Sequence, residues 1–200
     1  MNRIKVIIRS LLFKLINFIC YGDLPTSYYL QKGMIIGNNF HRQTGTKFDP
    51  SHCWLISIGN DVTIANNVQI LAHDDSPRFF SDYGKLGKVR IGDNSFIGAR
   101  TIILPNVTIG ENVIIGAGSV VVKDIPPNTI AVGNPARIHC SIDDYLAKCT
   151  REMQVKDKVF GKEYCNRNLS KEQKEELISA CKDGFCYIQM GKVIEYGRKS

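Results

Sequence analysis

The sequence of 200 residues lacks several features that would assign it to a familiar class. Its seven cysteines include no C-x-x-C pair and are odd in number. That pattern argues against a disulfide framework or a cysteine-based zinc site, and it favours a reducing, cytoplasmic location. The net charge of +7 suits an anionic partner. Nucleic acid is the weakest such partner, because no long basic block with interleaved aromatic residues occurs.

The sequence also lacks an uninterrupted hydrophobic run long enough to cross a membrane. Residues 2–20 are apolar, but Arg3, Lys5, Arg9 and Lys14 interrupt them. A spanning helix needs about 20 apolar residues with few charges, and a signal peptide needs an unbroken apolar core. We expect a helix here, which either packs on the protein itself or contacts an anionic membrane surface peripherally.

The most regular feature of the sequence is a repeat with a period of six residues between positions 89 and 138. An aliphatic residue begins each repeat, and a small or β-branched residue follows it four positions later. The aliphatic residues are Ile91, Ile97, Ile103, Ile109, Ile115 and Val121, and their partners are Ser95, Thr101, Val107, Val113, Ser119 and Ile125. Residues six apart share a face of a strand, whereas a helix would rotate them off one stripe. The repeat therefore predicts a β-solenoid with these residues inside.

Glycine follows the aliphatic residue in four of the repeats. These glycines are Gly92, Gly98, Gly110 and Gly116. We expect them to supply the unusual backbone dihedral angles that a chain needs where it turns a corner. Earlier in the chain the repeat is broken by an irregular run after Phe40 and by an excursion over about residues 76–90. Long excursions from a regular scaffold are usually functional or disordered, and the aromatic residues in this one argue against disorder.

The repeats, together with IGAGSVVVKDIPPNTIAVGNPARI, closely resemble the hexapeptide-repeat acyltransferases over about residues 36–139. This resemblance implies a mainly β fold, a left-handed parallel β-helix that forms a homotrimer and uses acetyl-CoA. The left hand comes from the resemblance alone, because parallel crossovers generally favour the right hand. We therefore expect an N-terminal helical segment at 1–34, the β-helix at 35–139 with a loop excursion at 74–90, and a C-terminal helical extension at 140–200.

Two short helices are predicted in the C-terminal extension. The first covers Ser141 to Met153, with acidic residues near its start. The second begins at Ser170, because Gln173 three residues later completes a capping box. We expect this extension to cover an open end of the solenoid or to contact another subunit.

His73 is the candidate catalytic base, because it alone of the four histidines lies where the repeats give way to the excursion. Imidazole has a pKa near 6.5, which suits proton abstraction near neutral pH. In the acyltransferases that the sequence resembles, a histidine at this place deprotonates the acceptor, which attacks acetyl-CoA directly. Asp74 and Asp75 can orient the imidazole or the acceptor. The same resemblance places the acceptor pocket near the start of the solenoid, so Asp49, His52 and Asp74 are candidate substrate-binding residues.

Four further positions match CoA-binding positions of the family. Ala99 and Ala117 are small enough for the pantetheine arm to lie against the backbone. Lys123 and Arg137 match residues that meet the nucleotide and phosphate end, although Val122 replaces the threonine that precedes the lysine in relatives.

The resemblance implies an acetyl-CoA-dependent O-acetyltransferase that acts on a sugar hydroxyl of a small molecule or glycan. An N-acetyltransferase for a nucleotide-linked amino sugar and a non-catalytic trimeric scaffold stay open. A serine acetyltransferase is disfavoured, because only Leu86-Gly87-Lys88 echoes its glycine-rich loop. Carbonic anhydrases on this solenoid use three histidines, and the repeat region offers only His73, with His52 outside its regular part. We therefore expect no metal.

Overall fold

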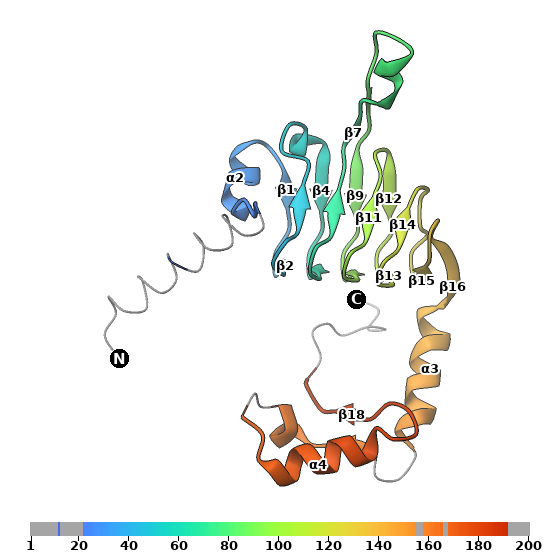
Figure 1. Ribbon diagram of the computed structural model, residues 1–200. Coiled ribbons are helices and arrows are strands. Elements are labelled where there is room, and N and C mark those ends of the chain that lie inside the picture. The colour runs from blue at the N-terminus through green and yellow to red at the C-terminus, as the bar shows by residue number, and fades with distance from the viewer. Residues whose placement is uncertain (1–11, 13–21, 155–157, 166–167, 192–200) are drawn as a thin grey trace. The chain divides into compact units, whose positions relative to one another are not determined.

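The computed structural model describes residues 12, 22–154, 158–165 and 168–191. The chain divides into two compact units after Ile142, and the first unit is a parallel β-helix (Figure 1). The predicted helix at residues 2–20 lies outside the described residues, apart from Leu12. None of the described helices has both the length and the apolar character that crossing a bilayer requires.

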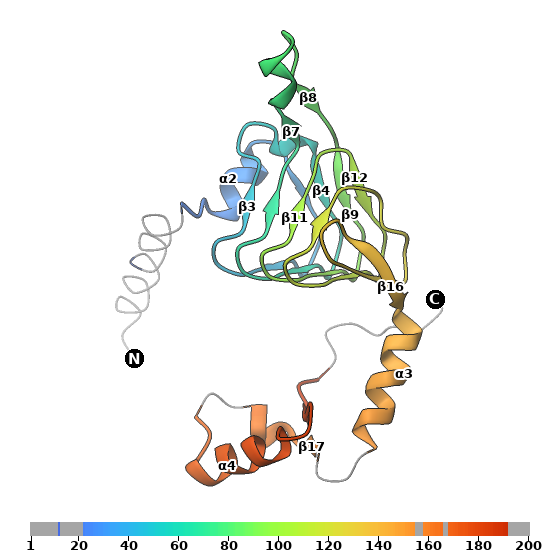
Figure 2. The same ribbon diagram turned by 45° about the vertical axis from the view of Figure 1, so that its right-hand side comes forward.

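Each coil of the β-helix contributes one short strand to each of three parallel sheets (Figure 2). The first sheet has the order β1-β4-β9-β12, the second β2-β5-β10-β13-β15 and the third β3-β6-β11-β14, and β16 adds to the second sheet in antiparallel orientation. The strands are β1 (Ile35–Ile36), β2 (His41–Arg42), β3 (Lys47–Phe48), β4 (Ile56–Ile58), β5 (Thr63–Ile64), β6 (Gln69–Ile70), β9 (Val89–Ile91), β10 (Phe96–Ile97), β11 (Ile102–Ile103), β12 (Val107–Ile109), β13 (Ile114–Ile115), β14 (Val120–Val121), β15 (Thr129–Val132) and β16 (Arg137–Ser141).

The core of the β-helix consists of the residues that the six-residue period predicts. All twelve aliphatic and partner residues are at most 5% exposed. The inward-facing hydroxyl groups find partners in the backbone: Ser95 Oγ donates to the Gly110 carbonyl at 3.1 Å, and Ser119 Oγ donates to the Gly116 carbonyl at 2.6 Å. The prediction of an interior built on these positions is confirmed.

The expectation about the glycine dihedral angles is wrong. Positive φ angles occur two residues after these glycines, for example at Asn94 (57°), Arg100 (60°) and Asn112 (53°). Glycine is needed at these positions for another reason, because neighbouring coils approach each other closely there. A Cβ atom on Gly92 would lie 2.6 Å from the carbonyl carbon of Gly110 in the next coil, nearer than such atoms can approach.

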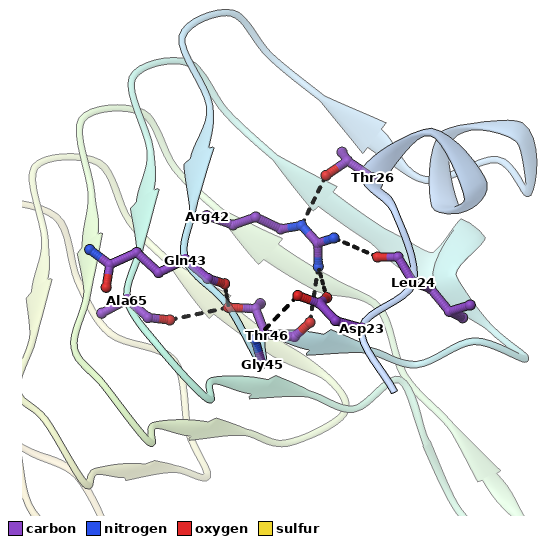
Figure 3. Close-up of polar contacts among 8 residues, drawn as sticks. All are labelled: Asp23, Leu24, Thr26, Arg42, Gln43, Gly45, Thr46 and Ala65. Atoms are coloured by element: carbon purple, nitrogen blue, oxygen red, sulfur yellow. Dashed lines mark hydrogen bonds and ion pairs between the residues drawn. The ribbon is translucent and has the colours of Figure 1, made fainter. Parts of the chain in front are cut away.

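Arg42 occupies an inward position of the first coil, where the following coils have an aliphatic residue. It pairs in register with Ile64 of β5. Its guanidinium carbon lies 6.0 Å from the ring centroid of Tyr29 and 5.7 Å from that of Phe48. Figure 3 shows its Nη1 paired with Oδ1 of Asp23, at 2.9 Å. The arginine therefore ties the segment before the solenoid to the end of its core.

A short helix, α2 (Thr26–Gln31), belongs to this end segment. Its Tyr29 is 2% exposed, and its ring packs edge-on against Phe48 with centroids 4.9 Å apart. Cys53 Sγ lies 3.8 Å from the Tyr29 carbonyl oxygen. Cys53 belongs to the turn η1 (Cys53–Leu55), so α2 also supports the loop that follows β3.

The excursion after β6 is an ordered hairpin. Its strands β7 (His73–Asp74) and β8 (Lys85–Leu86) pair in antiparallel orientation, with η2 (Ser76–Phe79) between them. The hairpin projects from one corner of the β-helix (Figures 1 and 2). The excursion is therefore structured, as its aromatic residues indicated.

The second unit begins at the second residue of α3 (Ile142–Met153) and contains β17 (Val159–Phe160), η3 (Lys162–Cys165), α4 (Lys171–Ala180) and β18 (Tyr187–Ile188). Both predicted helices are confirmed. Ser170 caps α4 through the expected capping box with Gln173. The parallel pair β17 and β18 completes the unit.

Candidate functional site

The candidate site lies at the corner between the third sheet and the first, where two successive coils carry insertions. Residues 49–55 follow β3, and residues 71–88 follow β6. Because β3 and β6 pair with Phe48 opposite Ile70, the first residues of the two insertions lie one above the other. This register brings Asp49 and His73 together although they are 24 residues apart.

The carboxylate of Asp49 is fully buried and accepts four hydrogen bonds. Its Oδ1 accepts from the amides of Ser51 and His52, each at 3.0 Å. Its Oδ2 accepts from the amide of Ala72 at 3.1 Å and contacts His73 Nδ1 closely. Burial alone would raise the pKa of Asp49, but these hydrogen bonds outweigh burial and lower the pKa below its ordinary value of 3.8. The carboxylate is therefore held ionised and fixed in orientation.

The contact with Asp49 sets the protonation of His73. An ionised carboxylate only accepts hydrogen bonds, so Nδ1 carries the proton and Nε2 keeps a lone pair. The hydrogen bond to Asp49 raises the pKa of His73 above its ordinary 6.5, and the negative charges of Asp49, Asp75 and Asp74 add to this effect against a smaller opposing effect of burial. The imidazole is 33% exposed, so the His73–Asp49 pair has the features of a general base with an oriented imidazole.

The structure therefore corrects the role expected for two acidic residues. Asp49 was predicted to bind substrate, but its buried carboxylate is engaged by His73 and the backbone. Asp74 or Asp75 was expected to orient the imidazole, but Asp74 accepts from the Ser76 amide at 2.9 Å and pairs with Lys85 at 2.9 Å. Both contacts lower the pKa of Asp74, and the contact with Ser76 has the larger effect. Adjacent residues of a strand point to opposite sides, so the side chain of Asp74 faces away from Asp49, the partner of His73.

His52 and Trp54 lie beside the pair. The rings of His52 and His73 have centroids 5.0 Å apart, and Trp54 lies 6.2 Å from His52 by the same measure. His52 keeps its side chain 28% exposed, and Trp54 is 53% exposed. An accessible aromatic surface therefore adjoins the candidate base, and His52 stays a predicted substrate-binding residue.

The predicted CoA-binding positions fall at different places on the solenoid. Ala99 and Ala117 lie at stacked corners between the second and third sheets, where the Gly118 amide donates to the Ala99 carbonyl at 2.8 Å. Lys123 is exposed and follows β14, at the same corner as His73 but two coils further along. Arg137 is exposed at the start of β16 and donates to the carbonyl before it at 3.0 Å. The CoA contacts of all four stay predictions.

A hollow of about 500 Å³ lies elsewhere, on the outer face of the first sheet. It is lined by residues of β4, β9 and β12 and the turns after them, including Ser57, Arg90 and Thr108. Neither His73 nor Asp49 contributes to its lining, so we do not assign the acceptor to it.

A parallel β-helix built on a six-residue repeat is the architecture that the resemblance of the sequence implied. Residues 88–123 match the family model described as bacterial transferase hexapeptide (six repeats). The chain belongs to the hexapeptide-repeat acetyltransferase family, and the predicted left-handed parallel β-helix is confirmed.

Several known proteins are similar to this chain. Protein CapG of Staphylococcus aureus is 50% identical over 102 residues, which are 49% of this chain and 59% of CapG. Serine acetyltransferase 3, mitochondrial, of Arabidopsis thaliana is 46% identical over 108 residues, 50% of this chain and 26% of that protein. A solved maltose O-acetyltransferase from Clostridium difficile 630 is 32% identical with a TM-score of 0.47, and the match covers 70% of this chain and 89% of that one. The chain thus spans less than two thirds of the length of CapG and of serine acetyltransferase 3.

Proposed function

We propose that this protein is an acetyl-CoA-dependent O-acetyltransferase that acts on a sugar hydroxyl, with His73 as the general base. The observation that carries the proposal is the His73–Asp49 pair. Asp49, fixed by three backbone amides, holds the proton on Nδ1 of His73 and leaves Nε2 able to accept another. A base oriented in this way by a carboxylate is what transfer to a hydroxyl requires.

The proposed reaction is a direct transfer. Nε2 of His73 removes the hydroxyl proton while the hydroxyl oxygen attacks the thioester carbonyl carbon of acetyl-CoA. The C–O bond forms, the tetrahedral intermediate collapses, and the C–S bond breaks. The imidazolium returns the proton to the departing thiolate, so CoA leaves as a thiol. The buried Asp49 carboxylate stabilises the imidazolium between these two proton transfers.

The surroundings of the pair support a sugar as the acceptor. Trp54 is exposed and adjacent to His52, and the apolar face of a sugar ring packs well on an indole. His52 offers an imidazole edge near the same place. For the cosubstrate, the cationic side chains of Lys123 and Arg137 suit the phosphates of CoA, and the exposed Ala117 leaves its corner open. We further propose a cytoplasmic homotrimer.

The test is thiol release from acetyl-CoA across a panel of sugars, nucleotide-linked amino sugars and serine. We expect turnover with a sugar hydroxyl and a loss on the order of 10²- to 10⁴-fold in His73→Ala. His41→Ala, which removes an exposed histidine from β2, is the matched control and should keep the wild-type rate. A turnover rate of His73→Ala equal to that of the wild type would refute the role of His73 as the general base. Acetylation of amino groups alone would favour the N-acetyltransferase.

Trp54→Ala tests the acceptor side separately. We expect the KM for the sugar to rise on the order of tenfold, since packing of the sugar ring on the indole is worth about 1 kcal/mol or more. The KM for acetyl-CoA should stay unchanged. Trp54→Phe should recover much of the affinity, and equal losses for both substrates would remove the argument for stacking.

A further inference from the structure

Three side chains direct potential metal ligands toward one point. Among the described residues, only Asp49, His52 and His73 bring three such groups together, with all ligand atoms within 4.8 Å of one another. Two of them come from the insertion after β3, and the third comes from β7. The cluster is therefore built by the register of two coils and by no local sequence motif.

His52 has a feature that the transfer reaction does not use. Its Nδ1 is buried and has no hydrogen-bond partner, although its ring is partly exposed elsewhere. Oδ1 of Asp49 lies 3.7 Å from this nitrogen, which is beyond a hydrogen bond. A buried polar atom without a partner is destabilising, and such an atom in a folded protein calls for an explanation.

A divalent transition metal would satisfy this nitrogen. Two imidazole nitrogens and one carboxylate oxygen form a common set for Zn²⁺, with water as the fourth ligand. Mg²⁺ and Ca²⁺ prefer more oxygen ligands, so they suit the cluster less well. The amides of Ser51, His52 and Ala72 already hold the Asp49 carboxylate, as hydrogen bonds to metal-ligating carboxylates do in metal sites. A small opening of the His73–Asp49 contact would make room for the ion.

We propose that Asp49, His52 and His73 form a Zn²⁺ site whose occupation switches the general base off. The ion binds Nδ1 of both histidines and Asp49, and it takes the place of the proton that His73 shares with Asp49. Neutral imidazole then carries its single proton on Nε2 of His73, so this nitrogen donates and no longer accepts. The inhibition rests on the proposed function, whereas metal binding does not.

The sequence predicted no metal here, because only His73 belongs to the regular repeats. The proposed site also differs from that of carbonic anhydrases on this solenoid, since it needs one carboxylate and two histidines of one chain. It is a regulatory site and supplies no catalytic metal. Its predicted consequence is a lower transfer rate when free Zn²⁺ rises.

Metal binding is tested on the full chain, without an affinity tag and stripped of metal by a chelator. Co²⁺ serves as the spectroscopic probe, and Zn²⁺ displaces it. We expect one Co²⁺ per chain with the visible absorption of a tetrahedral site, and an affinity lower by about 100-fold or more in His52→Ala. His41→Ala and His139→Ala remove exposed histidines and should bind as the wild type does. His52→Gln, of similar size, guards against misfolding and should also lose affinity.

The outcomes separate the two claims. Unchanged Co²⁺ affinity in both His52 variants, or equal losses in the His41 and His139 controls, would overturn the site. Zn²⁺ that binds without lowering the acetyl-transfer rate would overturn the switch. If no acceptor on the panel is acetylated, the proposed function fails, while the Co²⁺ titration still decides whether the metal site exists.

Discussion

Replacing Arg42 by methionine should destabilise the β-helix strongly. The change keeps the apolar stem against the rings of Tyr29 and Phe48 but removes the guanidinium. That group donates to Thr26 Oγ1 at 2.9 Å, to the Thr46 carbonyl at 3.0 Å and to the Leu24 carbonyl (Figure 3). It also pairs with Asp23. All of these acceptors would lose their donor at once.

The burial of the ion pair determines the expected magnitude. The side chains of Arg42 and Asp23 are 13% and 9% exposed. A surface ion pair contributes about 0–1 kcal/mol, whereas removing one partner of a buried pair costs about 3–5 kcal/mol because the other charge is stranded. Within the described part of the chain, Asp23 would keep only the hydrogen bond from the Gly45 amide at 3.2 Å. We therefore expect the free energy of unfolding to fall by about 3 kcal/mol or more.

Urea unfolding at a fixed protein concentration measures this loss, because association would otherwise shift the midpoint. Trp54 is the single tryptophan of the chain and reports on the supported end through its fluorescence. Arg78→Met is the matched control, since Arg78 pairs with Asp75 on the surface, with side chains 65% and 59% exposed, and should cost less than about 1 kcal/mol.

A double variant separates the stranded charge from the lost packing. Adding Asp23→Asn to Arg42→Met removes the unpaired carboxylate, so the two losses should be less than additive by about 1 kcal/mol or more. A loss below about 1 kcal/mol in Arg42→Met alone would refute the reasoning, because the pair would then behave as a surface pair.

Two further predictions concern the site and the coils. With a chelator present, kcat/KM should fall as the pH drops through the pKa of His73, which lies above 6.5, because protonated imidazole cannot accept a proton. Asp49→Asn removes the contact that raises this pKa, so the midpoint should move to lower pH and the plateau should fall about 10²-fold or more; an unmoved midpoint would contradict the assignment. Gly92→Ala should lower the melting temperature, since its Cβ would lie 2.6 Å from the backbone of the next coil, and overpacking costs about 1–3 kcal/mol. Unchanged melting would show that neighbouring coils can separate there at no cost.

The regular part of the fold could be predicted from the sequence because the six-residue period also determines which residues are buried. Each aliphatic residue between Ile91 and Val121 occupies an equivalent place in the coil, so one observation repeated six times fixes the interior. The same period in fact extends back from Ile36 through Arg42 to Phe48. An arginine at the aliphatic position concealed this coil, since only the end of a solenoid can accommodate a charge there beside Asp23.

The partner of His73 escaped prediction for a related reason. Asp49 lies 24 residues before His73, more than the 18 that separate paired positions of regular coils such as Ile91 and Ile109, because the insertion after β3 lengthens the coil. Sequence reasoning instead offered the neighbouring Asp74 and Asp75. The signal that would have found Asp49 is the pairing of Phe48 with Ile70, which places Asp49 beside Leu71, two residues before His73.

The position of the site follows from the geometry of the solenoid. Neighbouring rungs lie about 4.8 Å apart, so a side chain in one coil can contact one in the next without any long-range rearrangement. A regular corner has no room for this chemistry, because its residues are committed to the turn. Insertions at the same corner of two successive coils release Asp49 and His73 from that constraint, while the paired strands β3 and β6 hold their backbones in register. The scaffold is thus rigid up to the residue before Asp49, and the pair is oriented by the repeats although it lies outside them.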